Sequence, residues 1–139
     1  KGEPSYELIK KLSDDAMKLN ITAILTLEQI ENVSKNINEK TPAIVSLFAG
    51  RIADTGRDPI PYIKESLNIL KGNPHAELLW ASSRELLNIF QAEECGCHII
   101  TVTNDLLKKL QMVNKDLKEL SLDTVKMFYN DASSAGYSF

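Results

Sequence analysis

Four short runs of apolar and β-branched residues, each followed by a segment with helical spacing, constrain the fold of this chain most strongly. Runs of this length and composition are typical of strands that are buried on both faces of a sheet. A strand followed by a helix through a short connection, four times over, predicts a parallel α/β structure. The four runs are NITAIL (20–25), AIVSLF (43–48), AELLWAS (76–82) and HIITV (98–102).

The segments between these runs have the apolar spacing of amphipathic helices. One helix is expected over 4–18, before the first strand, and Thr26 is placed as the N-cap of the next. The segment AGRIADTGRD (49–58) is interpreted as a loop. The further helices are expected over 27–38, 59–72, 84–94, in NDLLKKLQM (104–112), and near 122–135 at the carboxyl end.

The number of strands favours half of a (β/α)₈ barrel. No glycine-rich phosphate or dinucleotide motif follows any of the four runs, which weighs against a doubly wound nucleotide-binding fold. A complete (β/α)₈ barrel needs about 250 residues and eight strands, whereas this chain has 139 residues. We therefore expect residues 1–139 to form one partial-barrel domain with four βα units and a C-terminal helix.

Charge and composition exclude several classes of function. The formal net charge of −3 argues against a general binder of nucleic acids or anionic membranes, because such proteins gain affinity from a cationic surface. The apolar runs are far shorter than the roughly 20 residues that cross a bilayer, and KGEPSYELIKK at the start has no apolar signal core. Cys95 and Cys97 are interpreted as reduced thiols. We expect a cytoplasmic protein.

Metal binding is not expected from this sequence. His75 and His98 are the two histidines, and no second ligand is spaced to join either of them. We expect no metal ion and no organic cofactor.

Small polar residues interrupt the first two strands. Side chains two residues apart on a strand share a face, so Asn20 lies with Thr22, and Ser46 lies with Phe48. Buried amide and hydroxyl groups need hydrogen-bond partners. Each of them, taken singly, can be explained by a neighbouring backbone group or a buried water molecule. Taken together they favour a polar site on the inward face.

Two arginines follow strands at the same end of the expected sheet. Arg51 comes three residues after the second strand and Arg84 two residues after the third. With the Ser82 hydroxyl they could bind a phosphate group through charge-assisted hydrogen bonds. Either arginine could instead lie in solvent or pair with an acidic neighbour such as Asp54, and spacing alone does not separate Arg57 from Arg51. The spacing supports an anion site at the strand ends.

Four motifs in order resemble the transaldolase family across essentially the whole chain. The resemblance implies the fifth to eighth strands of a (β/α)₈ barrel. It also implies transfer of a dihydroxyacetone unit between sugar phosphates of the pentose phosphate pathway, from sedoheptulose 7-phosphate to glyceraldehyde 3-phosphate, giving erythrose 4-phosphate and fructose 6-phosphate. In the family the reaction passes through a lysine Schiff base without a cofactor. The motifs are NITAILTLEQ, VSLFAGRIADTGRDP, LLWASSRE and LSLDTVKMFYNDASSAGYSF.

The resemblance assigns roles to residues of the first two strands. Asn20 is similar to the family asparagine that contacts the substrate and its Schiff-base intermediate, and Thr22 to the threonine that holds a proton-shuttling water. Ser46 matches the serine beside the substrate hydroxyls. Phe48 matches the aromatic residue that packs over them, where related aldolases that release the three-carbon unit tend to have tyrosine. The phenylalanine therefore favours transaldolase over an activity like that of fructose 6-phosphate aldolase.

The resemblance also identifies a phosphate site, formed by Arg51 in the phrase FAGRI and by Ser82 with Arg84 in WASSR. The family usually reads SPFVGRI where this chain has SLFAGRI, so Leu47 and Ala49 depart from the pattern while the arginine stays in place.

Three elements of the family mechanism would lie upstream of residue 1: the first-strand aspartate, the acidic residue of the third strand and the nucleophilic lysine of the fourth. A Schiff base needs an amine whose pKa is lowered by its pocket. Lys10, Lys11 and Lys18 are expected on a helix or at its end, outside the barrel, and Lys1 aligns better with a loop lysine. We therefore expect a part of a transaldolase.

A half barrel would leave two strand edges unpaired, which invites association. It would also expose inner-face residues such as Ile24 and Trp80. We expect a homo-oligomer, or completion by the missing half of the barrel. The alternative function is a non-catalytic sugar-phosphate-binding module.

Overall fold

The computed structural model describes residues 2–137, so Lys1 lies outside the described residues. One compact unit ends at Leu107 and a second begins at Lys108, whereas the sequence predicts a single domain. No helix within the described range is both long enough and apolar enough to cross a membrane.

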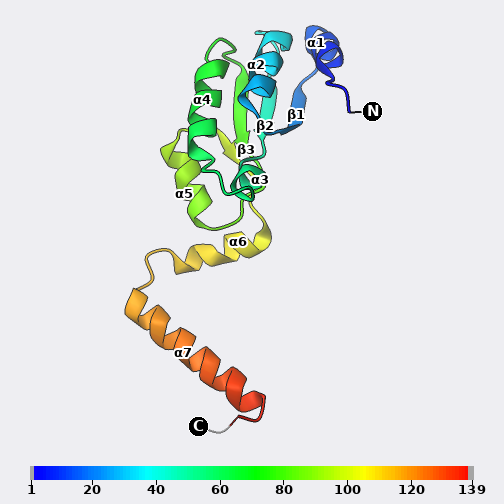
Figure 1. Ribbon diagram of the computed structural model, residues 1–139. Coiled ribbons are helices and arrows are strands. Elements are labelled where there is room, and N and C mark those ends of the chain that lie inside the picture. Colours follow the sequence, from blue (N-terminus) through cyan, green and yellow to red (C-terminus); the bar gives the residue numbers. More distant parts are fainter. Residues whose placement is uncertain (1, 138–139) are drawn as a thin grey trace. The chain divides into compact units, whose positions relative to one another are not determined.

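A four-stranded parallel sheet forms the centre of the first unit (Figure 1). Its spatial order, β1-β2-β3-β4, is the order of the strands along the chain, and all three pairings are parallel. Consecutive βα units of a barrel have this arrangement. The expected α/β fold, half of a (β/α)₈ barrel, is confirmed. The strands are β1 (Leu19–Ile24), β2 (Ala43–Leu47), β3 (Ala76–Trp80) and β4 (Ile99–Ile100).

The last two strands are shorter than the sequence predicts, for local reasons. After β3 the backbone of Ser82 has a φ of 61°, which takes the chain out of the extended conformation. Before β4 the N–H of Leu78 donates to Nδ1 of His98 at 3.0 Å, so a side chain provides the acceptor there. Regular pairing with β3 then extends only over Ile99 and Ile100.

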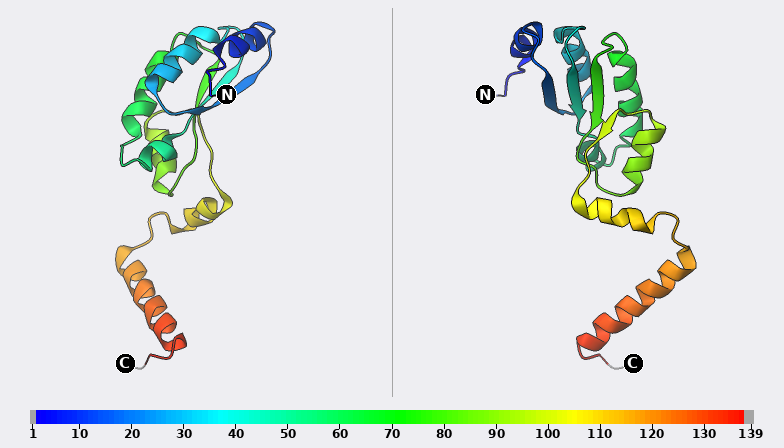
Figure 2. Two further views of the ribbon diagram at one scale, coloured as in Figure 1. Left: turned by 45° about the vertical axis from the view of Figure 1, so that its right-hand side comes forward. Right: turned by 180° about the vertical axis from the view of Figure 1, so that it is seen from behind.

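Helices α2, α4 and α5 lie on one side of the sheet, as both views in Figure 2 show. The predicted N-cap of α2 is confirmed, because Thr26 Oγ1 accepts from the Gln29 N–H at 3.2 Å while Gln29 Oε1 accepts from the Thr26 N–H at 3.0 Å. This reciprocal pair satisfies two backbone donors at the helix start. The four longer helices of the unit are α1 (Tyr6–Asp14), α2 (Leu27–Asn36), α4 (Ile60–Leu70) and α5 (Leu87–Glu94).

The hydrophobic core lies between the sheet and its helices. Alternate residues of the central strands are fully buried there, among them Val45 and Leu78. Ile24 and Trp80 belong to this core, with 3% and 0% exposure, so the expectation that they are exposed on the inner face is wrong. Trp80 shares a face with Leu78. The strand has a bulge between Ile21 and Ile24, where Ala23 has a φ of 62°. The extra residue reverses the alternation of side chains between the two faces, so Ile24 points into the core.

A short helix, α3 (Ala49–Ala53), occupies the segment that the sequence predicts as a loop. Its backbone approaches the end of β3 very closely. The Gly50 N–H donates to the Ala81 carbonyl at 3.2 Å, and a Cβ atom added at Gly50 would stand 1.6 Å from the carbonyl oxygen of Ser82. Only glycine fits this approach.

The carboxyl end of the chain forms helices as well. Helix α6 (Asn104–Lys108) follows β4, a 3₁₀ turn spans Lys109–Met112, and α7 spans Leu117–Ser134. Helix α7 therefore begins five residues before the predicted start near 122. The reason is the Asp116 side chain, which accepts from the N–H groups of Lys118 and Glu119 at 2.9 and 3.0 Å and caps the helix there.

The half barrel generates a prediction about association. In the part of the chain that the structure describes, β1 and β4 each pair on one side only, and unpaired strand edges promote association. We expect the isolated 139-residue chain to dimerise or aggregate in sedimentation velocity experiments. A monodisperse monomer with a single sharp calorimetric transition would contradict this expectation.

The close approach of α3 generates a second prediction. Replacing Gly50 with alanine should lower the free energy of unfolding by at least about 2 kcal/mol, because the clash is with backbone that must shift. Gly72→Ala is the matched control: its Cβ would meet nothing within 4 Å and its φ is not positive, so no loss and a gain of up to about 1 kcal/mol is expected. Urea unfolding measures both. Equal losses of unfolding free energy in the two variants would show that the close approach of α3 to β3 does not require glycine at position 50.

Candidate functional site

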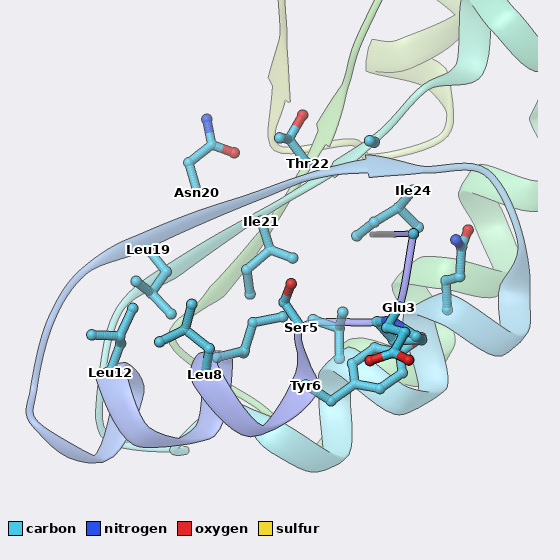
Figure 3. A pocket seen from close by; sticks show the side chains of 16 residues that line it. Glu3, Ser5, Tyr6, Leu8, Leu12, Leu19, Asn20, Ile21, Thr22 and Ile24 are labelled. Atoms are coloured by element: carbon cyan, nitrogen blue, oxygen red, sulfur yellow. The ribbon is translucent and has the colours of Figure 1, made fainter.

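The polar residues of β1 lie on the side of the strand that faces away from helix α1. Figure 3 shows Asn20 and Thr22 projecting to one side, while Leu19 and Ile21 point toward Leu8 and Leu12 on the other. Asn20 and Thr22 are both exposed. In a closed barrel this side of the sheet would face the interior.

Asn20 and Ser46 are joined directly. The Ser46 hydroxyl, 3% exposed, donates to Asn20 Oδ1 at 2.7 Å across the β1–β2 pair. Because a carboxamide carries its acceptor and its two donors on opposite sides, this bond fixes the orientation of the whole group. The Nδ2 donors of Asn20 then remain for another acceptor.

Phe48 and Arg51 are held together at the end of β2. Phe48 follows β2 directly, and its backbone N–H donates to the Ile24 carbonyl at 2.8 Å. The guanidinium carbon of Arg51, on α3, lies 5.9 Å from the centre of the Phe48 ring. A cation over an aromatic ring is attracted by the ring's negative face. Phe48 thus restrains an otherwise exposed arginine.

Arg84 makes the ion pair that the sequence leaves open as an alternative. Its Nε donates to Asp54 Oδ1 at 3.1 Å and its Nη2 to Asp54 Oδ2 at 2.5 Å. The two side chains are 48% and 52% exposed, so the pair contributes at most about 1 kcal/mol to stability. Asn88 Oδ1 accepts from the Arg84 backbone N–H at 2.8 Å and fixes the main chain at this point. Ser82, before it, is half-buried.

The structure separates Arg57 from Arg51, which spacing alone does not. Arg57 Nη1 donates to Thr55 Oγ1 in its own loop at 2.7 Å. It lines a hollow of about 330 Å³ together with Ile52 and Tyr62. Its contacts are therefore local, whereas Arg51 packs on Phe48 at the end of β2.

A hollow of about 530 Å³ lies between α1 and β1 (Figure 3). Its wall is mainly apolar, with Leu8, Leu12, Leu19 and Ile21 among the lining residues. Asn20 and Thr22 contribute to the wall, but their side chains project to the opposite side of the strand. The hollow is therefore separate from the polar side of the sheet.

The cysteines offer little for redox or metal chemistry. Cys95 and Cys97 are both free thiols, and burial raises the pKa of each above its usual value, which disfavours the reactive thiolate. The Nδ1 of His98 is occupied by the Leu78 N–H. Within residues 2–137 no three histidine, cysteine or acidic side chains are grouped to hold a metal ion.

The chain matches the family model described as Transaldolase/Fructose-6-phosphate aldolase over residues 3–138. A probable transaldolase of Herpetosiphon aurantiacus is 27% identical over 132 residues, covering 94% of this chain and 57% of that protein. The probable transaldolase of Clostridium acetobutylicum is 28% identical over 131 residues, covering 94% and 58%. That of Clostridium kluyveri is 31% identical over 122 residues, covering 87% and 54%.

The chain thus spans about half the length of the curated relatives that it matches. The family model extends across nearly the whole chain, including the strand ends that carry Arg51 and Arg84. This chain belongs to the transaldolase/fructose-6-phosphate aldolase family.

Proposed function

We propose that this chain supplies the substrate-binding part of a transaldolase. The reaction is transfer of a dihydroxyacetone unit from sedoheptulose 7-phosphate to glyceraldehyde 3-phosphate, which gives erythrose 4-phosphate and fructose 6-phosphate in the pentose phosphate pathway. One observation carries the proposal: the Ser46 hydroxyl orients Asn20, whose side chain projects from the side of β1 that faces away from α1. Family membership supports a transaldolase or aldolase chemistry in general.

The phosphate group of the substrate is proposed to bind at the carboxyl ends of the strands. Arg51 and Arg84 would provide planar guanidinium groups, and Ser82 a hydroxyl donor. Arginine suits a phosphate dianion because two parallel N–H groups meet two oxygens at once. The Phe48 ring beside Arg51 and the fixed backbone of Arg84 support this assignment, since both reduce the freedom that binding would otherwise cost.

The carbon skeleton of the substrate is proposed to lie over β1 and β2. The Nδ2 donors of Asn20, directed by the bond from Ser46, would meet an oxygen of the substrate and of its Schiff-base intermediate. Thr22, exposed on the same side, would hold the water that transfers a proton. Phe48 would pack over the three-carbon unit, and a phenylalanine in place of tyrosine favours transfer over release to water.

The nucleophilic amine is proposed to come from outside this chain, from an upstream segment or from a second chain that completes the barrel. Lys10 and Lys11 lie on α1, and Lys10 Nζ pairs with Asp14 at 3.0 Å. A lysine Schiff base provides the required activation without a metal or an organic cofactor. We place the protein in the cytoplasm, which suits the free thiols of Cys95 and Cys97.

Two other functions remain as candidates. A sugar-phosphate-binding module without catalysis would need only Arg51, Ser82 and Arg84, which this chain contains. The family description also includes fructose-6-phosphate aldolase, which would use the same positions. Covalent trapping distinguishes the binding module from a transaldolase. Dependence of the reaction on an acceptor aldose distinguishes a transaldolase from fructose-6-phosphate aldolase.

Covalent trapping tests the proposed chemistry. The full protein that carries these residues is reduced with borohydride in the presence of fructose 6-phosphate and digested for mass spectrometry. A reduced three-carbon adduct on a lysine outside residues 1–139 is expected, because Schiff-base formation precedes transfer. Absence of any adduct, together with retained binding of the phosphate ester, would favour the binding module.

Paired arginine variants test the phosphate site. Arg51→Ala should weaken fructose 6-phosphate binding about tenfold or more, because a charge-assisted hydrogen bond contributes roughly 1.5–3 kcal/mol. Arg57→Ala is the matched control in the same loop, and its side chain bonds only locally to Thr55. Titration calorimetry measures both affinities. Equal losses of affinity in the two variants would show that binding depends on the general charge of the loop and not on a site at Arg51.

A further inference from the structure

The carboxylate of Asp54 binds one edge of the Arg84 guanidinium group. Its two oxygens accept from Nε at 3.1 Å and from Nη2 at 2.5 Å, so the contact is bidentate. Asp54 terminates α3, in the connection after β2, whereas Arg84 follows β3. The pair therefore joins two loops that leave neighbouring strands at the same end of the sheet.

The adjacent edge of the same guanidinium group stays available. A guanidinium carries five N–H groups in one plane, and Asp54 occupies the one on Nε and one of the two on Nη2. Two N–H groups on Nη1 and one on Nη2 remain, and one from each nitrogen forms the edge that can bind two oxygens of a phosphate. The carboxylate and a phosphate can therefore bind Arg84 together, on different edges.

Asp54 is itself fixed by the approach of α3 to β3. Its backbone N–H donates to the Gly50 carbonyl at 3.0 Å, and Gly50 is bonded to Ala81 at the end of β3. Arg51, the other proposed phosphate ligand, lies three residues before Asp54 on this helix. One short helix thus carries an arginine and the carboxylate that holds the second arginine.

A competing role for Asp54 is that of an internal anion that phosphate must displace. Displacement would leave the carboxylate beside a phosphate dianion without its cation, which is unfavourable. Binding on the free edge of Arg84 reduces this repulsion, because the guanidinium cation stays in contact with both anions. The geometry thus favours a supporting carboxylate over a competitor.

We propose that Asp54 is a positioning residue of the phosphate site, which holds the Arg84 guanidinium so that its Nη1–Nη2 edge receives the phosphate of the substrate. The inference rests on the proposed function, because it takes the bound anion to be a sugar phosphate. Asp54 does not contact the substrate in this proposal and acts through Arg84 alone.

A double-mutant cycle tests the proposal in the full protein that carries these residues. The variants are Asp54→Ala, Arg84→Ala and the double variant, and calorimetry measures the binding of fructose 6-phosphate and of inorganic phosphate. We expect Asp54→Ala to weaken both about fivefold, a coupling of the size found between groups of one network. In the Arg84→Ala background the same change should have no effect.

A second readout follows the guanidinium group itself. In nitrogen-edited NMR spectra the Arg84 Nε–H signal should be protected from solvent exchange in the parent protein and lose that protection in Asp54→Ala. In Asp54→Asn the loss should be partial, because a carboxamide has one acceptor oxygen in place of two. Urea unfolding should change little in either variant, because both partners are half-exposed.

Several outcomes would overturn the proposal. Unchanged or tighter phosphate binding by Asp54→Ala would show that the carboxylate is idle or competes. A loss that persists in the Arg84→Ala background would show that Asp54 acts through the fold. If the parent protein binds neither ligand, the proposed phosphate site fails and this inference fails with it, whereas normal binding without coupling in the cycle overturns this inference alone.

Discussion

The backbone contact between Gly50 and the end of β3 is the constraint on which the proposed site depends. A side chain at position 50 would overlap the Ser82 carbonyl, so α3 can lie there only because this residue is glycine. The contact brings the short helix that bears Arg51 and Asp54 against the strand end that leads to Ser82 and Arg84. Local geometry at one residue thereby couples two loops that are separated in sequence.

The two sides of the sheet carry different kinds of side chain. The side under the helices is filled by apolar residues that are almost completely buried, such as Leu47, Leu78 and Trp80. The other side carries Asn20 and Thr22, exposed, and Ser46, whose hydroxyl is satisfied by Asn20. A buried hydroxyl needs such a partner, so the bond that orients Asn20 also satisfies a requirement of the fold. The same hydrogen bond therefore satisfies the buried Ser46 hydroxyl and orients Asn20 for its proposed role.

Patterns that repeat along the chain predict the regular part of this fold. The alternation of β-branched runs with amphipathic segments is enough for the parallel sheet, and Thr26 with Gln29 is enough for the start of α2. The same rule of alternation misplaces Ile24, because a single residue in the left-handed region, Ala23, reverses it. A bulge has no side-chain pattern of its own, since alanine is not a residue that favours positive φ.

The candidate site shows a similar limit. Spacing brings Arg51 and Arg84 to one end of the sheet, but it cannot decide whether Arg84 faces solvent, a phosphate or Asp54. The deciding contact is between residues 30 positions apart, in two irregular segments whose relative position depends on α3. That helix is only five residues long and lies in a segment rich in glycine and aspartate, which read as a loop. The glycine directly before Arg51 is the one signal in the sequence that could have indicated the close approach.

The contact between Phe48 and Arg51 uses only the face of the ring. Phosphate binding by Arg51 would therefore not depend on whether the three-carbon unit is transferred or released to water. The attraction of Arg51 depends on the ring face, which phenylalanine and tyrosine share. A tyrosine at this position, as the resemblance implies for the aldolases, would keep the arginine in place and add a hydroxyl to the space over the three-carbon unit. On this reasoning the phosphate end of the site can stay constant within the family while the fate of the intermediate changes at the ring's edge. The polar tip of one side chain, rather than a rearranged site, would then distinguish the two activities.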